Sequence, residues 1–284
     1  MMDSFLELYN YSFFQNALLG VLLLSIASAL IGTYIVIRRM VFISGGITHA
    51  CFGGLGLGYF LGINPILMAA VFAVTSSVGV EWLSNRGRVR EDTAIGVVWS
   101  LGMAVGTIFI FLTPGFTPDL NSFLFGNILT ITDGDLTAFA IYIALLLVFF
   151  IAFFRTIVIC AFDRDFAATI HLPVKAINLV MTIAIAICIV LTIRLIGIML
   201  LMSLFTLPQM TAELFVKRLR PMMLISVGVS IVCSLGGLIC SCFIDVPTSA
   251  MIVVAFVVVY ALARIVKLTS RDKTPVELPA EKVS

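Results

Sequence analysis

The sequence has few charged side chains, and this scarcity excludes most soluble folds. Only 11% of its 284 residues are Asp, Glu, Lys or Arg, whereas these residues make up about 25% of a typical soluble domain. Hydrophobic residues reach 61%. Apolar runs of about 20 residues recur along the chain, and each can cross a hydrocarbon core of roughly 30 Å as a helix. We therefore expect an all-α, polytopic membrane protein without a soluble module.

The sequence also lacks the motifs of several enzyme classes. It has no GxxxxGKS phosphate-binding loop, no HExxH and no GxSxG, which argues against an ATPase, a metalloprotease and a serine hydrolase. None of its six cysteines forms a CxxC pair, so buried free thiols are the favoured interpretation. We expect no enzymatic activity, no permanently bound cofactor and no nucleic-acid partner.

Polar and proline-containing interruptions divide the apolar sequence into about nine predicted helices. Their ranges are 13–37, 42–63, 66–83, 93–112, 136–154, 174–193, 196–215, 222–243 and 248–266. The joint at 191–197 is the weakest, and a break or re-entrant turn there would give about eight spans. Residues 1–268 form one predicted transmembrane domain, and the polar, proline-containing segment 269–284 is predicted to be a cytoplasmic tail.

The distribution of cations predicts the orientation of the chain. When the N-terminus is placed outside, all but one of the 17 Lys and Arg residues fall in cytoplasmic segments, as the positive-inside rule requires. The exception is Arg194. We expect a multi-pass protein of the plasma membrane with its N-terminus outside and its C-terminus in the cytoplasm.

His49 is the strongest candidate for a functional residue. It follows Arg39 by ten residues, which places it roughly 15 Å into the membrane, near the midplane. An ionisable side chain at that depth is costly and points to function, and neutral imidazole is a common ligand of divalent first-row metals. The alternative is a histidine that is hydrogen-bonded to a neighbouring helix. We predict a metal ligand.

Several glycines surround His49 in the sequence. Gly45, His49 and Gly53 are spaced by four and share one helix face. Together with Gly46, these glycines are predicted to line the path of an ion. Their alternative role is to let membrane helices approach closely.

Three carboxylates are further candidates for structural or functional roles. Asp92 is predicted to cap the fourth helix. Asp245, between the last two helices, either caps the last helix or passes a cation inward as a weaker metal site. Glu81 lies near a cluster of arginines, where a solvated carboxylate is the simplest interpretation.

The polar segment 163–174 is the main interruption on the cytoplasmic side. It has the pattern of a short amphipathic helix that could dock into a groove on a soluble subunit, although an ordinary linker has the same composition. Asp163 and Asp165 would be exposed to solvent, and the apolar face would contain Phe166, Ala167 and Ile170.

Five short motifs, taken in order, resemble the membrane permease subunits of bacterial ATP-binding-cassette importers for zinc, manganese or iron. They are RRM at 38–40 with His49 nine residues further on, DTxxG at 92–96, DLxxFLFGxxL at 119–129, IGxxLLxSLxxLP at 196–208, and DxP at 245–247. Each motif is weak alone in so apolar a chain. Their order and spacing make the resemblance specific, and it covers nearly all of residues 13–268.

The resemblance implies a set of partners and site residues. Such permeases form dimers in the inner membrane, bind two cytoplasmic ATP-binding subunits and receive metal from an extracytoplasmic binding protein. Segment 163–174 matches the helix that couples to the ATPase, and His49 matches the metal-site histidine. Two positions depart from the family pattern: Gly45 replaces an aspartate, and His171 replaces a glycine.

The leading hypothesis is therefore the permease subunit of an ATP-driven importer for a divalent metal ion. One alternative is transport of a larger metal chelate through the same fold, with Gly45 and Gly46 widening the path. Another is a proton-coupled carrier that needs no ATP and uses His49 and Glu81 as a relay. An intramembrane enzyme is a fourth possibility without a motif behind it.

Overall fold

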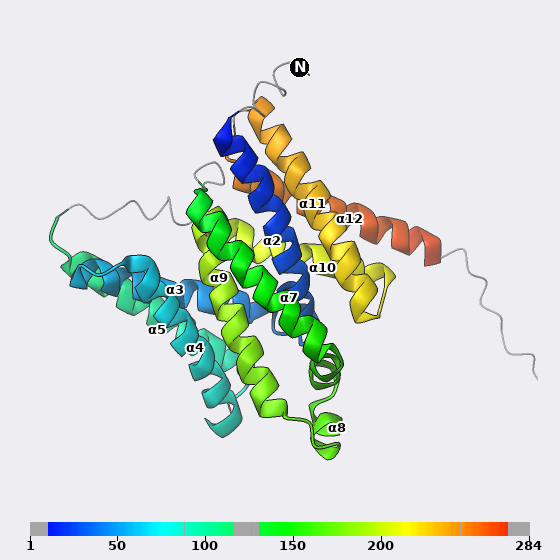
Figure 1. Ribbon diagram of the computed structural model, residues 1–284, viewed down its shortest axis with the longest axis horizontal. Helices are drawn as coiled ribbons and strands as arrows, with labels where there is room; N and C mark the ends of the chain where they lie inside the picture. Colours follow the sequence, from blue (N-terminus) through cyan, green and yellow to red (C-terminus); the bar gives the residue numbers. More distant parts are fainter. Residues whose placement is uncertain (1–10, 88, 116–125, 127–130, 245, 272–284) are drawn as a thin grey trace, which may run out of the picture.

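The computed structural model describes residues 11–87, 89–115, 126, 131–244 and 246–271, and all regular structure in these ranges is helical (Figure 1). The helices are α2 (Ser12–Ile37), α3 (Val41–Leu61), α4 (Pro65–Gly87), α5 (Glu91–Leu112), α7 (Asp133–Phe162), α8 (Arg164–Thr169), α9 (Val174–Leu204), α10 (Leu207–Phe215), α11 (Leu219–Ile244) and α12 (Thr248–Arg271). The described residues contain eight stretches long and apolar enough to cross a membrane. The predicted all-α membrane fold is confirmed. The number of spans in the described residues is the lower of the two that the sequence allowed, eight instead of nine.

The number of candidate membrane spans in the described part of the chain is eight, because no loop separates the sixth and seventh predicted helices. Residues 174–215 form one apolar stretch of 42 residues, and a straight helix of that size would be about 63 Å long, twice the hydrocarbon thickness. The backbone breaks at Gly197, with φ 76° and ψ 176°, a conformation that glycine adopts readily and other residues do not. The stretch is divided by this break and by the short join between α9 and α10.

Two helices extend beyond their predicted ends at residues 154 and 266. The fifth helix, α7, continues past Arg155 to Phe162 after a distortion at Phe153. The last helix, α12, continues to Arg271, so the predicted boundary at 269 lies inside its last turn. Arginine near the membrane surface places its charge in water without ending a helix. Residues 272–284 of the predicted tail lie outside the described residues.

Helix α2 occupies the centre of the molecule, between the α3–α4–α5 group on one side and α11 and α12 on the other (Figure 1). It is apolar on all faces, and 78% of its central window is buried, as expected for a helix that is surrounded by protein. The Gln209 side-chain amide of α10 donates to the Ser28 carbonyl at 2.7 Å, and the hydroxyls of Ser28 and Ser230 of α11 are 3.3 Å apart. These contacts join α2 to α10 and α11.

The α3–α4–α5 group has a different pattern of burial. The central window of α3 is 78% buried, compared with 22% for α4 and 17% for α5. Helix α3 is therefore covered by its two neighbours, which expose their outer faces. This arrangement places the segment that carries His49 against α5.

Candidate functional site

His49 is the one residue between positions 43 and 56 of α3 that is not buried. Its imidazole stacks on the indole of Trp99 from α5, with the ring centroids 4.5 Å apart and the planes within 5°. A parallel stack fixes the ring plane and leaves the nitrogen-bearing edge available. No described residue hydrogen-bonds these nitrogens, so the alternative of a histidine bonded to a neighbouring helix has no support in the described part of the chain.

Met202 fills the space beside Gly45. A Cβ atom built on Gly45 would lie 2.8 Å from Met202 Cε and 3.7 Å from Trp99 Cζ3. An aspartate at this position, as the family pattern inferred from the motifs has it, would therefore require the Met202 side chain to move. Sequence reasoning missed both Met202 beside Gly45 and Trp99 beside His49, because these contacts depend on how α9 and α5 pack against α3.

Gly46 and Gly53 lie at close helix contacts inside the protomer. A side chain on Gly46 would collide with Ile95 of α5, and a Cβ on Gly53 would lie 2.9 Å from the Gly102 carbonyl oxygen of α5 and from the Phe72 ring of α4. Close packing accounts for both glycines. Their predicted role in lining the ion path, and that of Gly45, remains a prediction.

One protomer supplies few metal ligands. The described residues contain no group of three His, Cys, Asp or Glu side chains that could hold a metal ion. Asp245, the weaker predicted metal site, lies outside the described residues. The imidazole of His49 is thus a single ligand at the surface of a protomer, and a transported ion there would complete its coordination with water or with groups from elsewhere.

A small polar cavity lies where α2, α4, α5 and α9 meet near the arginine-rich ends of the helices. Its volume is about 10 Å³, and its lining includes Arg38, Glu81, Glu91 and Arg164. Glu81 accepts a hydrogen bond from the Thr182 hydroxyl at 3.2 Å. Glu81 is therefore part-buried and bonded to α9, in contrast to the solvated carboxylate that the sequence predicted.

Helix α8 is shorter than predicted and divides its apolar residues between two environments. Asp163 caps the helix, because its carboxylate accepts from the Phe166 N–H at 2.9 Å, and Asp165 is exposed. Ala167 is fully buried, whereas Phe166 is 52% exposed and Ile170 is 45% exposed. The predicted common apolar face is therefore wrong: Ala167 anchors α8 to the bundle and two large apolar side chains remain available.

His171 ends this segment in a left-handed conformation, with φ 59°. The family pattern inferred from the sequence motifs has glycine at this position, and glycine adopts such a conformation without steric cost. The turn after α8 thus explains the glycine preference and identifies His171 as a mildly strained substitute.

Two of the five motifs meet at the opposite end of the molecule. Gly126 from DLxxFLFGxxL has φ 57°, and a Cβ atom on it would collide with the backbone of Ile196 and Gly197 from IGxxLLxSLxxLP. Both glycines are needed for this close approach. The motif at 119–129 is otherwise outside the described residues.

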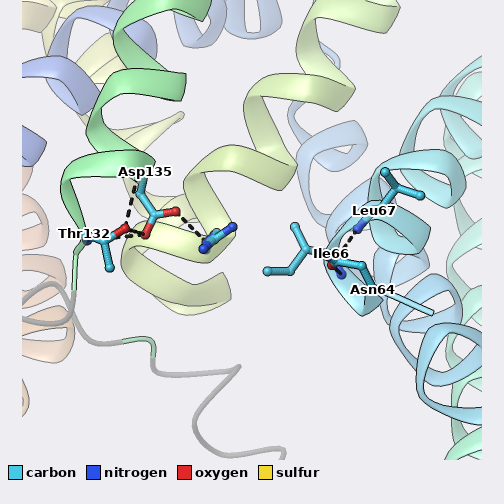
Figure 2. A network of polar contacts seen from close by, with 6 residues as sticks. Asn64, Ile66, Leu67, Thr132 and Asp135 are labelled. Atoms are coloured by element: carbon cyan, nitrogen blue, oxygen red, sulfur yellow. Dashed lines mark hydrogen bonds and ion pairs between the residues drawn. The ribbon is translucent and has the colours of Figure 1, made fainter. Parts of the chain in front are cut away.

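Ion pairing and capping also mark this end (Figure 2). Arg194 Nε lies 2.7 Å from Asp135 Oδ1. Asp135 and Thr132 form a capping box at the start of α7. The Asn64 carboxamide oxygen caps α4 by accepting from the Ile66 N–H at 3.0 Å. Arg194 is thus at the same end as the start of α7, as the predicted topology requires.

Asp92 does not cap α5. The helix begins at Glu91, its N-cap is Arg90, and no side chain caps it. Asp92 lies in the first turn instead, where a negative charge is favourable near the helix N-terminus.

These features define a polytopic helical membrane protein of the permease class. The chain matches the ABC 3 transport family over residues 10–267, and it belongs to that family. The resemblance inferred from the five motifs is confirmed.

Three relatives cover most of the chain. It is 35% identical over 263 residues to an uncharacterised membrane protein of Synechocystis sp., covering 93% of this chain and 94% of that protein. It is 34% identical over 258 residues to a probable metal transport system membrane protein of Chlamydia pneumoniae, with 88% of each covered. It is 30% identical over 261 residues to the manganese transport system membrane protein MntC of Listeria monocytogenes, with 91% and 92% covered.

Two solved structures share the fold. PsaBC from Streptococcus pneumoniae, in complex with Fab, superposes with a TM-score of 0.82 at 26% identity, covering 95% of this chain and 100% of that chain. An inward-facing putative metal-chelate type ABC transporter gives a TM-score of 0.69 at 14% identity, covering 89% and 85%; this likeness concerns the fold alone. The chain is the membrane-spanning transport subunit of a metal ABC transporter, and the ATPase is a separate subunit. Its class implies an ATP-binding subunit and a substrate-binding protein as partners.

Proposed function

We propose that this subunit passes a divalent metal ion, zinc, manganese or iron, across the bacterial inner membrane in an ATP-driven importer. The single observation that carries the proposal is His49: a partly buried imidazole, stacked on Trp99, in an otherwise buried stretch of a membrane helix. Intramembrane ionisable residues mark ion pathways. The Listeria relative is named for manganese, and this name favours manganese among the three ions.

The proposed site would bind its metal ion weakly, because it has few ligands. It offers one neutral imidazole and, beside Gly45, a thioether instead of a carboxylate. A transport site must bind an ion well enough to admit it and weakly enough to release it. No metal is held permanently in this proposal, because the ion is the cargo.

We further propose that the working unit is a permease dimer. His49 lies at the surface of a protomer, so a second copy must cover it to form an enclosed path between two protomers. The N-terminus would be outside and the C-terminus in the cytoplasm, because this orientation places nearly all cations inside.

Helix α8 is the proposed contact for the cytoplasmic ATP-binding subunit. Phe166 and Ile170 expose apolar surface, with Asp163 and Asp165 beside them, while Ala167 attaches the helix to the bundle. Arg164 of α8 lines the polar cavity that also contains Glu81 of α4 and Glu91 of α5. A displacement of α8 therefore reaches the helices that pack around α3.

Uptake into proteoliposomes tests the proposal. The permease would be reconstituted with its ATP-binding subunit and binding protein, and uptake of Mn²⁺, Zn²⁺ and Fe²⁺ would be compared with that of the same metals bound to a chelator. We expect uptake of a free ion that depends strictly on ATP. Preferential uptake of the chelate would support the larger-substrate alternative, and uptake without ATP would contradict the proposal.

A further inference from the structure

A second cavity lies far from His49, between the last turns of α7 and the join of α10 to α11. It has a volume of about 520 Å³, within the range of about 300–1,000 Å³ that is usual for ligand pockets. Phe154, Val158 and Phe162 of α7 give it an apolar wall. The join to α11 contributes the three cations Lys217, Arg218 and Arg220, with Leu219 between the two arginines. We refer to this cavity as the α7–α11 groove.

Two of the three cations of the α7–α11 groove have no acidic partner among the described residues. Lys217 has an acidic neighbour, Glu213, at 3.7 Å. No acidic side chain of the described residues lies within ion-pair distance of Arg218 or Arg220. The Arg220 guanidinium instead lies 4.7 Å from the centroid of the Phe154 ring, a cation–π contact that positions the group and leaves its N–H edge free to donate. The groove therefore has an unmatched positive charge beside an apolar surface.

The apolar wall belongs to a helix that is longer than the hydrocarbon core. Helix α7 has 30 residues and is about 45 Å long, roughly 15 Å longer than the hydrocarbon core. One or both ends of α7 must therefore extend into the headgroup region, and Phe162 in its last turn is 58% exposed. Toward the membrane interior, the same helix exposes Ile151 (78%) and Val148 (66%). An apolar surface thus runs from the groove along α7 into the bilayer.

We propose that the α7–α11 groove binds a phospholipid with an anionic headgroup. The phosphate would accept hydrogen bonds from Arg218 and Arg220, and an acyl chain would lie along the apolar wall of α7. Basic pockets between membrane helices on the cytoplasmic side have the chemistry to bind such headgroups. The charge of the groove and its continuity with the lipid-exposed side of α7 favour a lipid over a soluble anion. This site does not depend on which metal is transported.

Lipid titration of the purified full-length chain in a neutral detergent tests the proposal. The probe is fluorescent phosphatidylglycerol, and phosphatidylcholine is the neutral comparison. We expect the native chain to prefer phosphatidylglycerol and R218Q/R220Q to bind it about fivefold more weakly for each arginine removed. The charge-retaining R218K/R220K should keep most of the affinity, and it also provides a folded comparison if the glutamine variant is unstable.

The matched control is R155Q, which removes an exposed arginine from the same end of α7 but not from the lining of the groove. R155Q should bind phosphatidylglycerol like the native chain, and glycerol phosphate, which has no acyl chain, should not compete. Equal affinities of R218Q/R220Q and R155Q would overturn the proposal. A loss of the ATP-binding subunit from R218Q/R220Q with unchanged lipid binding would also overturn it, because the groove would then be a subunit interface.

Discussion

The two sides of the bundle are held together by different means. Around α3, backbones touch: a Cβ atom on Gly102 would collide with Ala50, and one on Gly106 would collide with Phe52. Around α2, polar side chains add to the packing: Gln209 donates to the Ser28 carbonyl, and the Ser28 and Ser230 hydroxyls meet. A close approach to the backbone occurs there at Gly32, where a Cβ would lie 2.7 Å from the Phe205 carbonyl oxygen. Lipid chains are as apolar as leucine, so membrane helices associate through close packing at small residues or through polar contacts. Gly46 and Gly53 thus allow α3 and α5 to pack closely, whereas Gly45 faces Met202 of α9.

The largest effect is expected on the glycine side. In Gly56→Val the new side chain would meet the backbone of Gly106, where even a Cβ would lie 2.9 Å from the Gly106 Cα. The backbone cannot move aside as a flexible side chain can. We therefore expect the free energy of unfolding to fall by about 3 kcal/mol, or the variant to fail to fold. Thermal unfolding in detergent measures this. The control is Gly79→Ala on α4, where no described atom lies within 4 Å of the added Cβ; an equal loss there would refute the packing argument.

A smaller loss of stability is expected when Gly197, at the break in α9, is replaced. Gly197→Ala places a Cβ on a residue with φ 76° and ψ 176°, which should cost about 2 kcal/mol. Gly228→Ala on α11, with open space around its Cβ, is the matched control. An unchanged unfolding temperature of Gly197→Ala would mean that the break is not required.

The polar side of the bundle should be more tolerant. Gln209→Leu removes the hydrogen bond to the Ser28 carbonyl, but it also removes a buried Gln209 Oε1 that has no partner. These effects partly offset each other, so we expect the free energy of unfolding to fall by about 1 kcal/mol. A loss as large as that of Gly56→Val would remove the contrast between the two sides.

The smallest effect is a gain in stability. His171→Gly relieves the left-handed φ of 59° after α8, while glycine also increases the freedom of the unfolded chain. The net gain should be about 0.5 kcal/mol. Chemical denaturation measures it, and a loss of stability would show that the His171 side chain has contacts that outweigh its strain.

The sequence predicted the class of fold well, because long apolar runs and one-sided cations are local features. It predicted the break near Gly197 as a weak joint, but not that the helix continues to Leu204. It could not predict the stack of His49 on Trp99 or the position of Met202 beside Gly45, since these depend on the rotation of α5 and α9 about their axes. The sequence also did not predict that Ala167 points into the bundle. The six residues of α8 are too few to show a reliable periodicity.

The central claim is that the His49 imidazole contacts the transported ion. The most direct measurement is metal uptake by His49→Ala in proteoliposomes that contain the complete transporter, with the amount of assembled protein matched to that of the native chain. Trp99→Phe, which keeps a ring beside His49, is the comparison. We predict that His49→Ala abolishes uptake while Trp99→Phe retains most of it. Native uptake by a fully assembled His49→Ala transporter would contradict the account.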